Sequence, residues 1–376
     1  MNTPESSLAR RGFLRMAGIA GVGLGFNLQR CIAGASLSRA DAAEAKAAMM
    51  PSGEIIVGLD IGTSKVRVLV GERQFDDTMK VLGVGRARSF GILSGEVVDS
   101  EAAAECVREA LMDAEMKTDV MIGETHLAVF GAPDIHRVGG RIKHCVRCVN
   151  AVGVEVGDIA LRPLTSARAV LDSDQEKLGA LVIDMGAGTT SYIVLADNQF
   201  KGWGVCDLGG DHITNDLSRG LRISMASAER LKREEGSVWP GSAMPGGRIV
   251  IEEPDGVCKE VERETLYSII RCRVREIFDR MKAHIETKEV RFDSLAAGVH
   301  LTGGGSMLRG IDGFAQDVFG IPAHLARAKG INWGASAPES PEYSCATGLL
   351  KLGAIRRANP GDTRRRYFLV IPKREA

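Results

Sequence analysis

Two aspartates stand at matching places in two similar stretches of this sequence, and the residues around them suit phosphate chemistry. Asp60 ends an apolar run and is followed by Gly62, and Asp184 ends another and is followed by Gly186. Each stretch continues into a second run rich in β-branched residues, so each predicts a strand, a tight turn and a returning strand. Such turns present backbone N–H groups to an anion, and the two carboxylates suit a hydrated metal ion.

The glycines of these turns are expected for two reasons. Glycine accepts positive φ angles, and it lets a ligand approach the backbone closely. Neither turn is a P-loop, because no Gly-Lys-Ser/Thr follows and no helix starts at once. The repetition of one hairpin design predicts two related α/β halves whose turns face one another.

A third glycine cluster, at residues 303–305, lies between an expected strand at residues 299–301 and an amphipathic helix. Glycines at a strand-to-helix turn permit close approach of a flat or anionic ligand near a helix N-terminus. Such a cluster is by itself often only a turn. Because it follows the two hairpins in the sequence, we interpret it as the third part of the same ligand site.

The elements that position these motifs come from a chain of ordinary globular composition. It has 376 residues, 44% hydrophobic and 26% charged, enough for about two or three domains. The formal net charge is zero and the basic residues are scattered, which argues against a nucleic-acid partner.

The eight cysteines lack the spacing of a disulfide scaffold and indicate reduced thiols. For Cys145 and Cys148 beside His144, a helix face is favoured over a zinc or redox site, since nothing nearby completes four ligands.

Residues 1–50 have the form of a twin-arginine export signal. Arg10 and Arg11 precede an apolar stretch, residues 16–28, that is too short to span a bilayer. Three interpretations stay open. The start codon lies farther downstream, at Met49 or Met50; or the segment is uncleaved and attaches to a membrane; or the protein is exported.

The three glycine motifs, in this order, resemble the actin-like ATPase superfamily, whose members close two α/β domains over a nucleotide. Residues 209–217 and 228–232 look like the FtsA family of bacterial cell-division proteins within it, as do residues 89–115, 161–171 and 343–353. The likeness covers roughly residues 53–355. It implies two RNase H-like domains around a nucleotide cleft, reduced here to subdomains 1A, 2A and 2B.

The resemblance also implies a division of the chain. The expected parts are a signal-like segment at 1–50, a first actin-like domain at 51–177, a second at 178–338 with subdomain 2B at about 214–282, a return to the first domain at 339–358, and a basic tail at 359–376.

By position, the resemblance assigns a site for ATP and Mg²⁺. The expected phosphate-binding residues are Gly62, Thr63, Ser64, Gly186, Ala187, Gly188 and Thr189. The expected adenosine- and ribose-binding residues are Glu229, Lys232, Gly303, Gly304, Gly305 and Met307. Asp60 and Asp184 would hold Mg²⁺ through water, and Asp184 is the one candidate for a catalytic role. Judged without the family, Glu229 and Lys232 form an i,i+3 ion pair on a helix surface.

Two departures from the family limit what carries over. The stretch between residues 129 and 155 is too short for the inserted subdomain 1C, so the family's filament contacts are not carried over and self-association stays open. Arg162 stands before Pro163 where many relatives have Glu, and a guanidinium is no general base at neutral pH. We therefore expect an ATP binder with slow or no hydrolysis, at most a weak ATPase.

The family's partners give the remaining expectations. The long helix of subdomain 2B receives the C-terminal peptide of FtsZ in relatives, and Arg271, Arg273 and Arg275 would face either such a peptide or solvent. The basic tail would contact anionic lipid or remain solvated. The implied function is a cytoplasmic adaptor linking FtsZ filaments to the inner face of the cell membrane, which conflicts with a working export signal. The alternatives are a pilus-assembly adaptor of the PilM kind and a phosphotransferase of the same superfamily.

Overall fold

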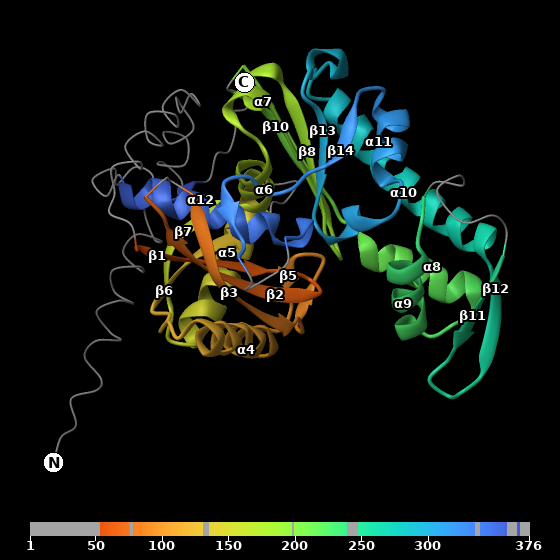
Figure 1. Cartoon of the computed structure of the whole chain (residues 1–376), viewed down its shortest axis with the longest axis horizontal. Helices are drawn as coiled ribbons and strands as arrows, with labels where there is room; N and C mark the ends of the chain where they lie inside the picture. The colour runs from red at the N-terminus through yellow and green to blue at the C-terminus, as the bar shows by residue number, and fades with distance from the viewer. Residues whose placement is uncertain are drawn as a thin grey trace.

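The computed structural model describes residues 53–75, 78–130, 135–197, 199–238, 247–334, 339–358 and 367–368. Figure 1 shows them as two halves, each with its own sheet, that lie side by side. The expectations for residues 1–50 and for most of the basic tail fall outside the described residues.

The first half is built on a sheet with the strand order β15-β3-β2-β1-β6-β7-β16. Its strands are β1 (Ile55–Ile61), β2 (Lys65–Arg73), β3 (Met79–Arg88), β6 (Glu124–Val129), β7 (Glu155–Leu161), β15 (Ile331–Asn332) and β16 (Tyr367–Phe368). Strands β1, β2 and β3 are antiparallel neighbours, whereas β6 lies parallel to β1, and β7 parallel to β6. The described piece of the basic tail thus adds an edge strand beside β7.

The second half repeats the same design in a sheet ordered β10-β9-β8-β13-β14. Its strands are β8 (Ala180–Met185), β9 (Thr190–Ala196), β10 (Gln199–Cys206), β13 (Gly298–Thr302) and β14 (Ala323–Leu325). Again three antiparallel strands are followed by two parallel ones, so β3-β2-β1-β6-β7 and β10-β9-β8-β13-β14 correspond strand by strand. The prediction of two related α/β halves is confirmed.

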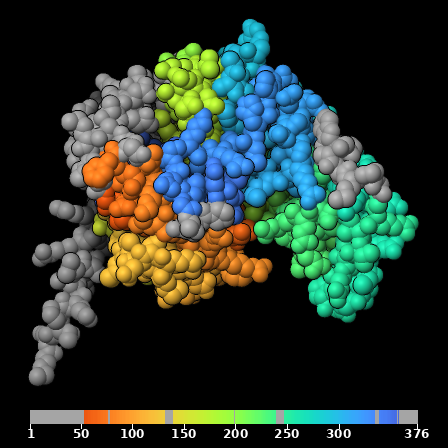
Figure 2. All heavy atoms as spheres, in the orientation of Figure 1, coloured from red at the N-terminus to blue at the C-terminus, as the bar shows by residue number. Residues whose placement is uncertain are grey.

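Helices cover both sheets and join them. In the first half these are α4 (Ser100–Thr118), α5 (Ile135–Ala151), α6 (Arg162–Val170), α7 (Ser173–Leu178) and α12 (Ser344–Ala358), with a short hairpin β4 (Ile92–Leu93) and β5 (Glu96–Val97). Helix α6 contacts β6 and β7 of one sheet and β8 and β9 of the other, so it lies between the halves. Helix α12 packs on α6 and β1, and Figure 2 shows the blue surface of this C-terminal part beside the orange surface of the first half.

The second half carries its own helices and one small hairpin. They are α8 (Gly210–Leu221), α9 (Met225–Glu235), α10 (Arg263–Glu286) and α11 (Ile311–Phe319), with β11 (Arg248–Glu252) and β12 (Cys258–Glu262), and two short 3₁₀ turns η1 (Phe292–Ser294) and η2 (Gly304–Met307); a further 3₁₀ turn, η3 (Pro341–Tyr343), directly precedes α12 in the segment that returns to the first half. Helix α10 buries Leu266, Ile270, Val274 and Phe278. These buried residues recur at helical spacing, and they lie in the long helix that the sequence analysis expects in this part of the chain.

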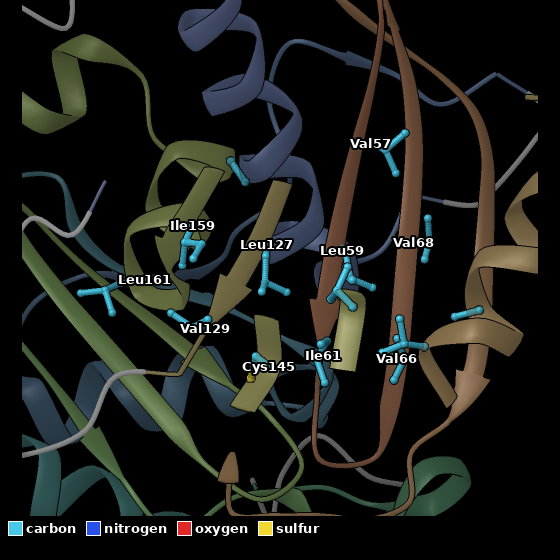
Figure 3. Close-up of a cluster of buried hydrophobic side chains, with 14 of the residues drawn as sticks. Val57, Leu59, Ile61, Val66, Val68, Leu127, Val129, Cys145, Ile159 and Leu161 are labelled. Carbon is cyan, nitrogen blue, oxygen red and sulfur yellow. The ribbon is translucent and has the colours of Figure 1, made fainter. Parts of the chain in front are cut away.

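The core of the first half fixes the strand that carries Asp60. Leu59, Val68 and Leu127 come from three adjacent strands and are fully buried in one cluster, shown in Figure 3. Each such side chain contributes about 1.5–3 kcal/mol through burial. Because alternate residues of a strand point to opposite faces, this packing fixes which way the residues between them face.

Helix α5 is the only element that the described residues contain between β6 and β7. Its Cys145 and Cys148 are free and buried in the core of the first half. Burial raises the pKa of Cys145 to about 12, so this thiol stays protonated. In the described part of the chain no group of three or more His, Cys, Asp and Glu is arranged to hold a metal ion. No described helix is both long and apolar enough to cross a membrane.

Candidate functional site

The β1–β2 and β8–β9 turns are of the same kind. In the first, the Gly62 N–H donates to the Lys65 carbonyl at 3.0 Å; in the second, the Gly186 N–H donates to the Thr189 carbonyl at 2.9 Å. Two residues remain at each tip, Thr63-Ser64 and Ala187-Gly188. Both predicted strand-turn-strand units are confirmed.

The two turns face one another and touch. A Cβ atom placed on Gly188 would lie 2.8 Å from the hydroxyl oxygen of Thr63. The side chain of Thr63 can approach the backbone of the second turn this closely because Gly188 has no side chain. The phosphate-binding residues expected from the sequence are therefore gathered at one junction between the halves.

One expected reason for glycine in these turns is wrong. Positive φ angles occur at twelve of the described glycines, but Gly62, Gly186 and Gly188 are not among them. Crowding is the physical reason instead. A Cβ on Gly62 would lie 2.8 Å from the Lys65 carbonyl oxygen, and one on Gly186 would lie 2.9 Å from the Thr189 carbonyl oxygen.

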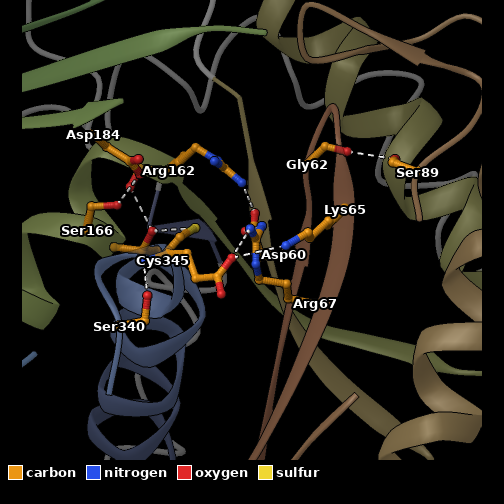
Figure 4. Close-up of polar contacts among 12 residues, drawn as sticks. Asp60, Gly62, Lys65, Arg67, Ser89, Arg162, Ser166, Asp184, Ser340 and Cys345 are labelled. Carbon is orange, nitrogen blue, oxygen red and sulfur yellow. Dashed lines mark hydrogen bonds and ion pairs between the residues drawn. The ribbon is translucent and has the colours of Figure 1, made fainter. Parts of the chain in front are cut away.

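The two aspartates lie beneath these turns, and a guanidinium lies with them. Asp60 is 1% exposed and Asp184 is 4% exposed. Oδ1 of Asp60 accepts a close ion-pair hydrogen bond from Nη2 of Arg162, the first residue of α6. Oδ2 of Asp184 accepts a 2.6 Å hydrogen bond from the hydroxyl of Ser166, one turn along the same helix. Figure 4 shows α6 presenting both side chains to the two carboxylates.

Burial and charge pairing act against each other in this group. Desolvation raises the pKa of Asp184, although the nearby Arg162 opposes that shift. For Arg162, desolvation alone would lower the pKa, but the Asp60 carboxylate and other acidic neighbours raise it on balance. Arg162 therefore carries a permanent charge next to Asp60, and its Cζ also lies 4.5 Å from the ring centre of Phe130.

Sequence reasoning missed a second set of charges at the same place. Arg67 on β2 is the cross-strand partner of Asp60, and its Nη1 lies 3.7 Å from Oδ2 of that residue. Its Nη2 donates to Glu342 at 3.0 Å, and Lys65 lies 3.4 Å from the same carboxylate. The hairpin register would have revealed Arg67, since Asp60 and Arg67 stand opposite once the turn is placed. The residues next to Glu342 in the sequence do not indicate that it belongs to the site.

The third glycine cluster contacts the second hairpin. Gly303 has a φ of 82°, and a Cβ there would lie 2.3 Å from Oδ1 of Asp184. A Cβ on Gly305 would lie 2.6 Å from Cγ of Met185. All three glycine motifs therefore converge on the ends of β1 and β8. Met307 is 57% exposed at the rim of this region, and its sulfur lies 3.6 Å from the Ser340 hydroxyl.

Glu229 and Lys232 form the ion pair that their spacing alone predicts, and they also lie near the second turn. Nζ of Lys232 donates to Glu229 at 2.5 Å, to the Thr214 hydroxyl at 2.7 Å and to the Gly210 carbonyl at 3.0 Å. The Gly210 N–H in turn donates to the Gly186 carbonyl at 2.9 Å. Helices α8 and α9 thus link this pair to the glycines of the second hairpin.

The carboxylates do not fit a hydrated Mg²⁺ as they are arranged here. Such an ion needs carboxylate lone pairs that point at it or at its water shell. Asp60 is paired with Arg162 and approached by Arg67, and Asp184 accepts a hydrogen bond from Ser166. A divalent cation between them would also be repelled by the guanidinium of Arg162.

A separate groove lies on the helices of the second half. It is lined by Asp216, Arg219, Ser268, Ile269, Cys272 and Arg273, from α8 and α10. Arg273 donates to Asp216 at 2.6 Å. The other two arginines named for a peptide partner also have intramolecular acidic neighbours, because Arg271 lies 4.0 Å from Glu264 and Arg275 lies 3.7 Å from Asp279.

The sequence is similar to FtsA proteins. The model of the family "Cell division protein FtsA" matches residues 181–348. FtsA of Neisseria meningitidis serogroup B is 29% identical over 367 residues, covering 78% of this chain and 88% of the relative. FtsA of Escherichia coli K12 is 25% identical over 385 residues, covering 81% of this chain and 92% of the relative. The expected resemblance to FtsA is confirmed.

The fold is similar to solved actin-like structures. MreB5 of Spiroplasma citri bound to ADP aligns with a TM-score of 0.61 at 18% identity, covering 82% of this chain and 99% of that one. A PilM-PilN type IV pilus biogenesis complex aligns with a TM-score of 0.60 at 15% identity, covering 80% of this chain and 98% of that one. At these identities the likeness concerns the fold alone, and the predicted actin-like fold is confirmed.

Proposed function

We propose that this chain, which is similar to FtsA proteins and has an actin-like fold, is a cell-division adaptor that binds ATP at the junction of its two halves. In this proposal it links FtsZ filaments to the inner face of the cytoplasmic membrane. In this proposal ATP binding controls the adaptor, and the protein does not convert a substrate into a product.

The observation that carries the nucleotide proposal is the contact between the two glycine turns. Thr63 and Gly188 bring the hairpins together, and Gly303 joins them next to Asp184. Backbone N–H groups of such turns bind phosphate oxygens without needing charged side chains. A solved actin-like structure with this fold, MreB5 of Spiroplasma citri, holds ADP, and another of the same protein holds AMPPNP.

The proposal assigns little or no ATP hydrolysis to the chain. Hydrolysis in actin-like proteins needs a group that orients the attacking water, and a carboxylate is suited to that task. Arg162 takes the place where many relatives have Glu, and its guanidinium is paired with Asp60. A permanently charged donor cannot accept a proton from water.

For the protein partner we propose that the groove between α8 and α10 takes the C-terminal peptide of FtsZ. The similarity to FtsA supports this, together with the groove's mixture of an apolar side chain, Ile269, and cationic ones, Arg219 and Arg273. The ion pair between Arg273 and Asp216 would have to open, or the peptide would have to bind beside it.

The decisive experiment is recovery of partners from native cells with and without ATP. We expect the tagged full chain to recover FtsZ, and Ile269→Asp in the groove to lose it. Val250→Asp is the matched control, because Val250 is 64% exposed on β11, away from the groove. Recovery of pilus-assembly proteins in place of FtsZ would favour the PilM-like alternative and overturn this proposal.

The membrane part of the proposal depends on residues 1–50. Intact-mass measurement of the native protein, together with membrane fractionation, separates the three interpretations. A mass that begins at Met49 or Met50 removes the segment from the mature protein, and a full-length membrane-bound species supports an N-terminal tether. A periplasmic species would contradict a cytoplasmic adaptor altogether.

A further inference from the structure

The guanidinium of Arg162 lies between the two turns that we propose hold the phosphates. A Cβ on Gly62 would lie 3.5 Å from its Nη2, and a Cβ on Gly186 would lie 3.7 Å from its Nη1. Nη2 is thus adjacent to the first hairpin and Nη1 to the second. Among the nearest atoms to a Cβ on Gly62 and to a Cβ on Gly186, Arg162 is the one side chain that the two positions share.

The position of Arg162 is held from several sides. Nη2 donates to Asp60, and the guanidinium stacks on Phe130 with Cζ 4.5 Å from the ring centre. Pro163 follows it at the start of α6, where proline is compatible with the first helical turn. The side chain is therefore a fixed element of the junction, and it is not a mobile surface charge.

The charges at the junction are already balanced in part by protein groups. Two buried carboxylates, Asp60 and Asp184, face Arg162, with Arg67 at 3.7 Å from Asp60. A metal ion in an actin-like site brings positive charge to the phosphates and is placed by carboxylates. Here a guanidinium already lies at the carboxylates, and guanidinium is a strong partner for phosphate as well.

We propose that Arg162 supplies the positive charge that a divalent metal would otherwise bring to the nucleotide phosphates, so that this chain binds ATP without a metal ion. The proposal rests on the nucleotide site proposed above. Arg162 acts in it as a binding residue: it stays paired with Asp60 and faces the phosphates from between the two turns. No bond is made or broken, and no metal is required.

The test is a calorimetric titration of the full chain with ATP, once in excess Mg²⁺ and once in EDTA. We expect the two dissociation constants of the wild type to agree within about threefold. Arg162→Gln should bind ATP at least about tenfold more weakly in EDTA than in Mg²⁺, because the charge is gone and Asp60 is released for the metal. Arg162→Lys, which keeps the charge, should remain largely independent of Mg²⁺.

The controls separate this inference from the nucleotide proposal itself. Arg280→Gln, an exposed substitution on α10, should behave like the wild type in both buffers. Loss of wild-type binding in EDTA would overturn the inference and leave the nucleotide site standing, and that comparison does not require any variant to fold. An Arg162→Gln protein that is folded and indifferent to Mg²⁺ would also overturn it. Absence of ATP binding in both buffers would refute the nucleotide site and this inference together.

Discussion

Glu342 accepts a 3.0 Å hydrogen bond from Nη2 of Arg67, although 275 residues separate the two in the chain. Arg67 also approaches Asp60, and Glu342 lies in the short segment that precedes α12. The segment that returns to the first half therefore takes part in the charge arrangement of the site. Stability of the junction and occupation of the site are expected to depend on this distant pair.

Replacing Glu342 by Gln should destabilise the fold. Burial by itself would raise the pKa of Glu342, but Arg67 and Lys65 lower it on balance, which shows that the carboxylate is favoured in the folded state. The amide loses both ion pairs, and we expect a loss of about 1–3 kcal/mol in the free energy of unfolding. Urea denaturation near neutral pH measures it.

The matched control for that substitution is Glu286→Gln at the exposed end of α10. A surface carboxylate of this kind should change the free energy of unfolding by less than about 0.5 kcal/mol. Equal effects of the two substitutions would contradict a special role for Glu342.

Gly186→Ala should weaken ATP binding. The new Cβ would lie 2.9 Å from the Thr189 carbonyl oxygen, which belongs to the backbone of the same turn and cannot move aside alone. The turn must shift, and the N–H groups proposed to hold phosphate shift with it. We expect a dissociation constant at least about tenfold higher in a calorimetric titration.

Gly313→Ala makes the same chemical change where there is room. Nothing lies within 4 Å of a Cβ at that position on α11, so the affinity for ATP should stay that of the wild type. If Gly186→Ala is folded and binds ATP as well as Gly313→Ala does, the assignment of the second turn to phosphate fails.

The hairpins were predictable because their information is local. Asp60 and Asp184 each end an apolar run beside glycine, and no distant contact is needed to place a two-residue turn. Helix α10 was predictable for a similar reason, since its buried residues, such as Ile270 and Val274, recur at helical spacing. The reason for glycine in the turns was predicted wrongly, because positive φ angles were expected, whereas a Cβ at Gly186 would be crowded by the Thr189 carbonyl and one at Gly188 by Thr63.

The charges of the site could be predicted only in part. Arg162 is recognisable in the sequence as a departure from the family, but its pairing with Asp60 depends on where α6 packs between the two sheets. Arg67 follows from the register of the first hairpin once Asp60 is placed. Glu342 follows from neither, because the return of the chain to the first half is a property of the whole fold.

Purified protein should turn ATP over far more slowly than an ordinary enzyme. Arg162, paired to Asp60, stands where the family resemblance places Glu in many relatives, and a guanidinium cannot take over the role of a carboxylate that orients water. We expect a rate at least about a hundredfold below the roughly 10 per second that is typical of enzymes. Phosphate release measures it, with Asp184→Asn prepared in parallel as the background from contaminating ATPases. A rate near 10 per second that disappears in Asp184→Asn would contradict the adaptor proposal.

Acid should weaken the second half through His300, whose side chain is buried on β13. Burial lowers the pKa of His300 from 6.5 to about 4, with a further contribution from the neighbouring His324. Between these values the unfolded chain binds a proton that the folded chain does not. The stabilising contribution is therefore complete above about pH 6.5 and is lost progressively as the pH falls toward about 4.

The expected size of the His300 effect is about 1–2 kcal/mol between about pH 7 and about pH 5, to be measured by urea denaturation at several pH values. His300→Gln is the informative variant, because the amide can still donate to the Ala297 carbonyl, which lies 3.0 Å from Nε2, but does not titrate. Groups distant from this position titrate in both proteins, so the difference between the two curves reports on His300 together with its contact with His324. The variant should lose less stability on acidification, and parallel curves would show that protonation of His300 is not coupled to folding.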